Sequence, residues 1–239
     1  MGKSRVIEAF VLGLFICMGL FLAGKSIYKS AETINQSKRF VTVKGLAERE
    51  VKADRAIWPL TFRDGADDLN RLYISLEKKT QAVKEFLQSK GFSDKEYGVS
   101  APEIVDRKAE RYGSSNNNAL RYLGSVTVTV YSTQVDSVVK AISDTSELVR
   151  KGVALDTADY RSRTEFLFTR LNDIKPGMIE QATLKAREAA KKFAEDSGSR
   201  LGKIRNARQG QFSISPRDSG TPYIKKVRVV NTLEYYLVD

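Results

Sequence analysis

Apolar and polar residues alternate along three segments of the chain, a period of two that is typical of β-strands with one buried face. Residues 40–53 and 56–63 show this pattern first, and the short gap between them predicts a tight turn near Asp54. The pattern returns close to the C-terminus at 225–238. We therefore expect strands at both ends of the folded part of the sequence.

Apolar residues spaced three and four positions apart predict helices between these strands. The clearest stripe covers 67–90, with acidic residues at its start and Gly91 just past its end. Further helices are expected at about 134–150 and 176–197, the second with Pro176 in its first turn. The remaining strands are expected at 97–105, 121–131, 160–169 and 204–214. The predicted order is ββαββαβαββ, an α+β fold with three helices.

A nearly unbroken apolar run lies within the first 30 residues. Residues 9–24 contain 16 uncharged residues. A helix of that length spans about 24 Å, slightly less than the ~30 Å hydrocarbon core of a bilayer. Flanking apolar residues lengthen the run, so residues 6–24 predict a transmembrane helix. We expect residues 1–30 to form a signal anchor, followed by one α+β domain over 31–239.

A cleaved signal peptide, which would release the domain as a secreted protein, is the alternative, because Lys3 and Arg5 form a short basic region before the apolar run. Ala23 and Gly24 are followed directly by Lys25 and no A-x-A site is present, which favours an uncleaved anchor. The local bias of lysine and arginine would place the C-terminal side in the cytoplasm. A very short basic N-terminal tail is normally retained there, however, and this would place the domain outside the cytoplasm.

The composition excludes several kinds of chemistry. The chain has no histidine, which excludes Ser-His-Asp and Cys-His catalytic arrangements and metal sites built with histidine. Its single cysteine, Cys17, lies in the apolar run, so an intrachain disulfide is excluded. The sequence contains no Walker, dinucleotide-binding or calcium-loop motif. We expect no cofactor and no bound metal.

Charged residues crowd the first predicted strand and its turn, three acidic and three basic: Glu48, Glu50, Asp54, Lys44, Arg49 and Lys52. Residues i and i+2 share a face of a strand, so two of the carboxylates and one lysine lie together as on a solvated face. A general acid or base needs a carboxylate in a low-dielectric pocket, whereas the neighbouring cations favour ionisation. We interpret the segment as the polar face of a strand, with Asp54 as a turn or capping residue.

Pairs of serine and lysine three residues apart could suggest a serine nucleophile activated by lysine. They occur as Ser26/Lys29, Ser75/Lys78 and Ser137/Lys140. Chance explains most such pairs in a chain this rich in serine and lysine, and no Lys-Thr-Gly segment follows them. We assign no catalytic residue and expect a protein that is not an enzyme. A hydrolase with a Ser/Lys or carboxylate site is kept as a remote alternative.

Basic residues outnumber acidic ones, giving a formal net charge of +11 at pH 7. They cluster at 107–111, 200–208 and 225–228, and such a field attracts lipid headgroups, acidic glycans or nucleic acid. Nucleic acid is not expected, because no aromatic-studded binding motif accompanies the basic runs. We interpret the basic runs as an ordinary solvated surface, and binding of an anionic surface is the alternative. The candidate residues for binding an anionic surface are Arg200, Lys203, Arg205 and Arg208.

Two segments carry motifs that occur together in a known family. VTVKGLAEREVKADRA at 41–56 is similar to an opening strand with a V-x-P-D-x-A turn; Val51, Asp54 and Ala56 match it, and an alanine replaces the typical proline. The alanine-rich helix running into SGSRLGKI at 197–204 is similar to an A-x3-A…G-x-x-LG-x-V pattern. Their order and spacing resemble the SIMPL-domain family of bacterial envelope proteins, over essentially the whole predicted domain.

The resemblance implies a periplasmic domain on the inner membrane, roles in envelope protection that include oxidative stress, and a tendency to form homo-oligomers. The last strand has high β-propensity and few charges, so an edge position would invite pairing with another copy. Our candidate self-association residues are Val230, Tyr236 and Val238. The expected function is that of a non-enzymatic, membrane-anchored, self-associating envelope protein. The alternative is a module that binds an anionic lipid headgroup or an acidic glycan.

Overall fold

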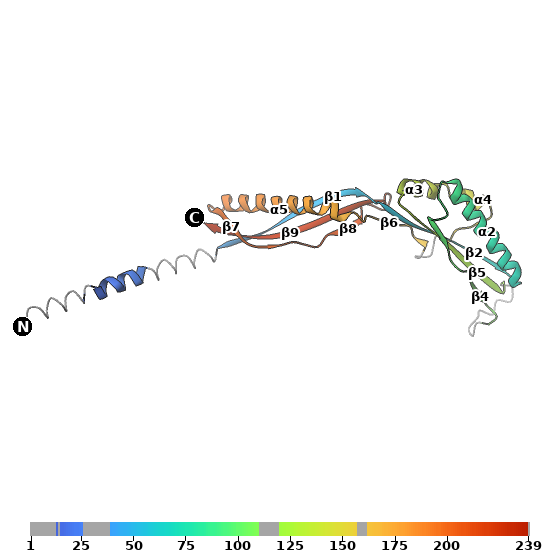
Figure 1. The fold of residues 1–239 in the computed structure, drawn as a ribbon, viewed down its shortest axis with the longest axis horizontal. Coiled ribbons are helices and arrows are strands. Elements are labelled where there is room, and N and C mark those ends of the chain that lie inside the picture. The colour runs from blue at the N-terminus through green and yellow to red at the C-terminus, as the bar shows by residue number, and fades with distance from the viewer. Residues whose placement is uncertain (1–12, 14, 26–38, 110–119, 157–161, 239) are drawn as a thin grey trace, which may run out of the picture. The chain divides into compact units, whose positions relative to one another are not determined.

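The computed structural model describes residues 13, 15–25, 39–109, 120–156 and 162–238 (Figure 1). Within these residues the chain has an α+β fold, as predicted. In chain order the elements are β1 (Phe40–Lys52), β2 (Arg55–Ala66), α2 (Leu69–Ser89), β3 (Tyr97–Val99), β4 (Glu103–Asp106), β5 (Tyr122–Ser132), α3 (Val135–Ser143), α4 (Ser146–Arg150), β6 (Glu165–Leu167), α5 (Leu171–Asp196), β7 (Arg200–Arg208), β8 (Ser213–Pro216) and β9 (Ile224–Val238).

The N-terminal apolar run is helical where the structure describes it, at residues 13 and 15–25, and its side chains are exposed. None of the helices in the described residues is both long enough and apolar enough to cross a membrane. Residues 6–12 and 14 of the expected transmembrane helix lie outside the described residues.

The chain divides into two compact units. The first consists of Met1–Arg49, Ile174–Ser213 and Val227–Asp239, and the second of Glu50–Asp173 and Ile214–Lys226. Each unit has a sheet with helical cover, and we describe each by itself.

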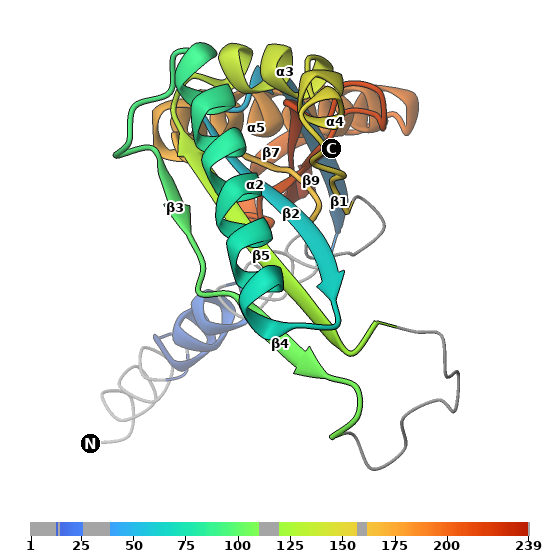
Figure 2. The same cartoon turned by 90° about the vertical axis from the view of Figure 1, so that its right-hand side faces the viewer.

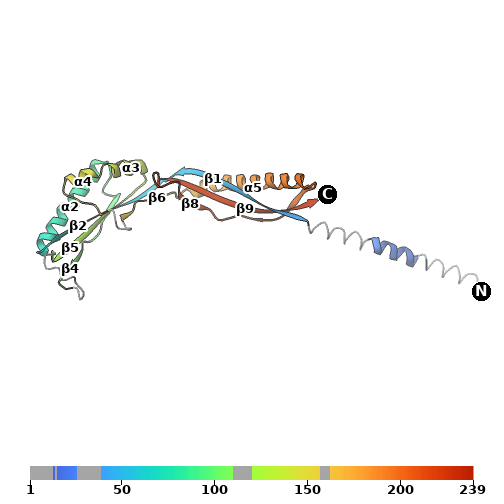
Figure 3. The same cartoon turned by 180° about the vertical axis from the view of Figure 1, so that it is seen from behind.

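The first unit is built on a sheet with the strand order β1-β9-β7. β8, which belongs to the second unit from Ile214 onward, also pairs with β9. Figure 3 shows α5 running alongside β1 and β9. The helix lies close to the sheet because its buried positions recur every four residues and carry small side chains: Met178, Ala182, Ala186, Ala190 and Ala194. Gly45 of β1 faces this row, and a Cβ atom there would lie 1.9 Å from the carbonyl oxygen of Ala182.

The second unit is built on a sheet with the strand order β3-β5-β2-β6, and β4 also pairs with β5. β2 and β5 are antiparallel over the whole of Ala56–Ala66, from Ala56 opposite Ser132 to Ala66 opposite Tyr122. Figure 2 shows α2 lying along these two strands. The core beneath it contains the buried aromatic side chains Trp58, Phe62, Phe86, Phe92 and Phe166.

Two predicted strands are each broken in two. The segment expected at 97–105 forms β3 and β4, because Pro102 has no N–H group with which to continue a ladder. The segment expected at 204–214 forms β7 and β8 with Gly210 between them, where a Cβ atom would lie 2.1 Å from the carbonyl oxygen of Val230. Of the strand expected at 160–169, only β6 forms in the described residues.

The predicted count of three helices and the order ββαββαβαββ are wrong. The helix expected at 134–150 is divided into α3 and α4, because the hydroxyls of Ser143 and Thr145 bond to carbonyl oxygens of the preceding turn, at 3.3 and 2.9 Å. The helix expected at 176–197 begins at Leu171, so Pro176 lies inside it rather than in its first turn. Over the described residues of the domain the order is ββαβββααβαβββ.

Candidate functional site

A groove of about 1000 Å³ opens between α5 and β7 in the first unit. We call it the basic groove; one edge of α5 between Thr183 and Glu195, residues 199–204 and Tyr235 line it. The spacing of the sequence explains which residues of α5 line the groove. Arg187 and Lys191 each follow a buried alanine by one residue, so they lie beside the row of small side chains that packs on the sheet.

The cations of the groove come from two elements, with Arg187 and Lys191 on the helix and Arg200 and Lys203 on the strand. The one acidic lining residue, Glu195, lies 4.0 Å from the ammonium of Lys191. The lining therefore has an excess of positive charge. Neither Arg187 nor Lys203 forms an ion pair with any residue that the structure describes. Cations gathered in a concave site produce a focused positive potential that attracts anions.

Apolar side chains make up much of the remaining lining. Leu184 is 51% exposed and Ile204 is 52% exposed, so both present carbon surface to a ligand rather than to the core. Leu201 and the ring of Tyr235 lie deeper, in the cluster packed against Ala186 and its neighbours. The groove is therefore amphipathic, with charge and apolar surface side by side.

Only two of the four predicted anion-binding residues, Arg200 and Lys203, line the basic groove. The guanidinium of Arg205 instead lies 4.0 Å from the ring centre of Phe40 and 3.8 Å from the carboxylate of Glu234. Arg208 stands opposite Thr232 in the ladder and does not line the groove. Arg205 and Arg208 therefore lie apart from this groove, because irregularities in the register on both sides of Ile204 change which face each side chain takes.

Arg187 and Lys191 were not among the site residues predicted from the sequence. Their spacing of four residues, with Glu195 four further on, is a signal that could have found them, since such residues form one stripe along a helix. Nothing in the sequence indicated that this stripe would lie beside β7.

The three predicted self-association residues lie on β9, which is a central strand between β1 and β7. The prediction that this strand forms a sheet edge was therefore wrong. Val230 and Tyr236 are half-buried and Val238 is 38% exposed. They alternate with the residues that pack on α5, so they share the opposite face of the sheet. Phe40 of β1, which is 44% exposed, belongs to the same face.

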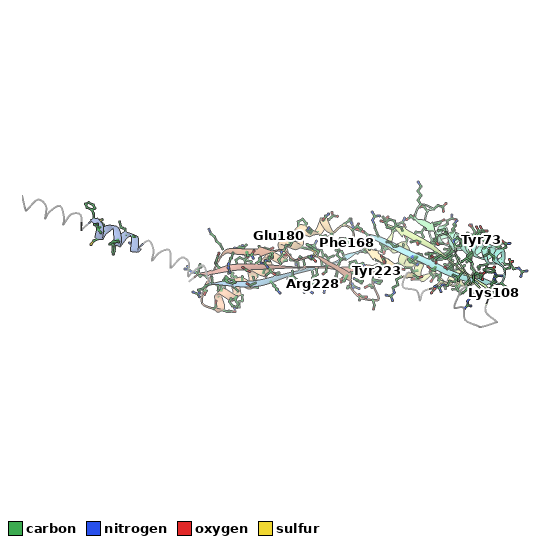
Figure 4. All side chains as sticks on the ribbon, turned by 90° about the horizontal axis from the view of Figure 1, so that it is seen from below. Tyr73, Lys108, Phe168, Glu180, Tyr223 and Arg228 are labelled. Carbon is green, nitrogen blue, oxygen red and sulfur yellow. The ribbon has the colours of Figure 1, made fainter. Side chains whose placement is uncertain are left out.

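Glu48, Glu50 and Lys52 of β1 are exposed, as predicted for the solvated face of this strand. Glu48 pairs with Arg228 of the same unit at 3.5 Å, and Figure 4 labels this arginine. In the second unit Glu50 lies 3.2 Å from Arg217, and Lys52 bonds to a carboxylate on α3. Asp54 binds backbone N–H groups, but not those of its own turn: it accepts bonds from residues 169 and 170, just before α5.

The serines of the Ser-x-x-Lys pairs that the structure describes bond to other partners. The Ser75 hydroxyl donates to Asp64 and the Ser137 hydroxyl donates to Gln134, rather than to Lys78 and Lys140. Ser26 and Lys29 lie outside the described residues.

A family model described as SIMPL, a protein of unknown function (DUF541), matches residues 41–231. The chain belongs to the SIMPL family. The match begins in β1 and ends in β9, so it takes in the described elements from β1 to β9, and it confirms the resemblance found in the opening strand and the alanine-rich helix. A comparison with curated proteins finds no match.

Proposed function

We propose that this protein is a membrane-anchored envelope protein that binds the anionic headgroup of a phospholipid in the basic groove. The observation that carries the proposal is the meeting of Arg187 and Lys191 from α5 with Arg200 and Lys203 from β7 around one groove. Phosphate is the anion that such a set of guanidinium and ammonium groups suits best, because both are strong donors of charge-assisted hydrogen bonds.

The apolar lining favours a lipid over an acidic glycan. A glycan presents hydroxyl groups along its whole length, and these would lose water at Leu184 and Ile204 without gaining hydrogen bonds. The glycerol backbone and first methylenes of a phospholipid would instead bury carbon surface against the same side chains. Inorganic phosphate alone would use only the charged part of the site.

The number of residues between the apolar run and the groove also supports this proposal. The guanidinium of Arg39 donates a hydrogen bond of 3.2 Å to the hydroxyl of Ser199, which lines the groove. Arg39 follows Lys25 by 14 residues, and a chain of that length reaches at most about 50 Å. With residues 6–24 in the inner membrane, the groove stays within that reach of the headgroups. The proposed arrangement is single-pass with the domain in the periplasm.

The test uses the full-length chain in an uncharged detergent, titrated calorimetrically with short-chain phosphatidylglycerol or phosphatidylcholine. We expect tighter binding of phosphatidylglycerol, weakening as salt is added because counterions screen exposed charge. The double variant Arg187→Glu/Lys203→Glu should lose this preference, whereas Arg208→Glu, a charge reversal outside the groove, should keep it. Equal affinity for the two lipids, or an unchanged preference in the double variant, would overturn the proposal.

Two further titrations distinguish the source of the anion. Inorganic phosphate should compete only weakly, and an acidic oligosaccharide without phosphate should not compete. Competition by the oligosaccharide as strong as that by phosphatidylglycerol would identify a glycan site instead. The cleaved alternative is checked by N-terminal sequencing of the mature chain, since a terminus after residue 24 would remove the anchor.

Self-association is a second candidate function, and the open face of the first unit's sheet favours it. Phe40 and Leu46 on β1 are 44% and 42% exposed, and they share this face with Val230, Tyr236 and Val238. A second copy would bury this apolar surface face to face rather than by adding a strand beside β9. A part in envelope or oxidative-stress protection stays an expectation from the family resemblance. The absence of enzymatic activity stays an expectation from the lack of a catalytic motif in the sequence.

A further inference from the structure

A buried lysine lines a second cavity, in the second unit. Lys225 at the start of β9 is 7% exposed, and the cavity beside it has a volume of about 520 Å³. That volume is within the ~300–1,000 Å³ range of sites that hold small molecules. Figure 4 labels Phe168, which lines the cavity, and Tyr223, whose ring packs edge-on against Phe166 at a centroid distance of 6.0 Å.

The surroundings of Lys225 are mostly apolar. Its amine makes no hydrogen bond and no ion pair with any residue that the structure describes. The apolar part of the lining consists of Phe166, Leu167, Phe168, Ile214, Pro216 and Pro222.

Burial lowers the pKa of the Lys225 amine below its usual value of 10.5. The negative charge of Glu165, the other charged residue of the lining, acts in the opposite direction and only partly offsets this effect. Glu165 itself is exposed, so solvent screens its charge. A lysine with a lowered pKa has a larger neutral fraction near pH 7, and the neutral amine is the nucleophilic form.

We propose that Lys225 is a nucleophilic amine that forms an imine with a small apolar aldehyde entering this cavity. The Nζ lone pair adds to the carbonyl carbon, and the electrons of the C=O π bond move to oxygen, which takes up a proton. Nζ then loses its protons as the hydroxyl leaves as water and the C=N bond forms. The step consumes one aldehyde, releases one water and needs no oxidant or reductant.

The lining of the cavity is the reason why we propose an apolar aldehyde. A ligand in contact with Phe168, Ile214 and Pro216 gains free energy by burying carbon surface, while a charged carbonyl compound would lose its hydration there. The site is separate from the basic groove, because the two share no lining residue. A failure of the proposed lipid binding would therefore leave this inference unaffected, and the reverse also holds.

The test traps the imine by reduction. The full-length chain in uncharged detergent at pH 7 is treated with a limiting amount of hexanal and cyanoborohydride, and labelled lysines are located by peptide mass mapping. We expect Lys225 to be the first lysine labelled, ahead of its neighbour Lys226. The same treatment with glyoxylate, a charged aldehyde, should show no preference for Lys225.

Two variants extend the test. Lys225→Met removes the amine with little change of volume, and Lys225→Arg keeps the charge; each should lose the first adduct without a change in labelling elsewhere. Lys226→Arg is the matched control and should keep it. Labelling of Lys225 no faster than that of Lys226 in the unmodified chain would overturn the inference, and this result does not depend on how well the variants fold.

Discussion

The carboxylate of Asp54 accepts hydrogen bonds from the backbone N–H and from the hydroxyl of Thr169, 115 residues further along the chain, at 3.0 and 3.1 Å. It also accepts a bond of 3.2 Å from the N–H of Arg170, directly before α5 begins at Leu171. One side chain in the β1–β2 turn thus satisfies donor groups at the start of a distant helix, where N–H groups have no partner within the helix.

Replacing this carboxylate should destabilise the second unit. We expect Asp54→Ala to lower the free energy of unfolding by about 1–3 kcal/mol, because the N–H groups of residues 169 and 170 lose their acceptor. The fluorescence of the single tryptophan, Trp58, which lies buried in this unit, reports the urea midpoint. Asp136→Ala is the matched control, since Asp136 is an exposed partner of Lys52; an equal effect of the two substitutions would contradict the prediction.

Close packing at Gly45 gives a second prediction. An added Cβ atom would lie 1.9 Å from the carbonyl oxygen of Ala182 and 2.5 Å from the backbone nitrogen of Ala186, so α5 would have to move. We expect Gly45→Ala to cost about 3 kcal/mol of stability, at the upper end for an overpacked site. Gly98→Ala in β3 should cost less than about 0.5 kcal/mol, because nothing lies within 4 Å of the added atom. Circular dichroism during urea unfolding compares the two.

Hydrogen bonding to Glu96 gives a prediction on pH dependence. The hydroxyl of buried Ser132 donates to this carboxylate at 2.6 Å, and the N–H and hydroxyl of Ser93 donate at 3.1 and 3.0 Å. The Ser132 hydroxyl, and then the bonds from Ser93, hold the pKa of Glu96 below its ordinary value of 4.5. Since the folded-state pKa is lowered, the stabilisation is fully present above about pH 4.5 and is lost as the pH falls through the folded-state value.

Ser132→Ala should therefore destabilise the protein at pH 7 by about 1.5–3 kcal/mol, the range for a hydrogen bond to a charged group. The difference from the unmodified chain should shrink as the pH is lowered below 4.5. Urea midpoints at pH 7 and at pH 3.5 to 4, roughly the window set by the ordinary pKa of a glutamate, measure both effects. A constant difference between the two conditions would mean that the bond does not stabilise the charged carboxylate.

The open face of the first unit's sheet gives a prediction on oligomeric state. Tyr236→Lys should weaken self-association, because an ammonium at a buried contact between two copies would have no partner. Light scattering coupled to gel filtration of the full-length chain in detergent measures the mass. Val149→Lys, at a position of α4 that is 63% exposed, is the control and should have no effect. An unmodified chain that stays monomeric at tens of micromolar would remove this second candidate function.

The fold could be predicted from the sequence wherever periodicity alone decides the structure. α2 formed within two residues of its predicted start and one of its predicted end, with the Asp68 side chain capping the Arg71 N–H. The β1–β2 turn at Asp54 also formed as predicted. The start of α5 was predicted too late in the sequence, because a proline after a polar stretch is typical of a first turn. The helix begins earlier, at Leu171, where the carboxylate of Asp54, far away in the sequence, accepts a hydrogen bond from the N–H of Arg170.

The site was only half predictable, for a similar reason. Arg200 and Lys203 stand out as a basic run, but a run of residues on a strand is distributed over two faces, and the irregular register around Ile204 cannot be read from composition. Arg187 and Lys191 belong to the site only because β7 lies beside their edge of the helix, which depends on strand order. In the sequence, Lys225 is one cation of a basic cluster. Its burial depends on aromatic and proline side chains that come from other segments of the chain.

The central place of β9 constrains the order in which the first unit can form. β2 and β5 lie within 80 residues of one another, so the largest pairing of the second unit is available early in synthesis. β1 and β7 have no partner in their sheet until β9 has been made, and pairing across such a separation is intrinsically slow. Tyr235 of β9 also lines the basic groove. The groove is therefore complete only in chains that have been synthesised through β9, so occupancy of the groove would report that folding is finished.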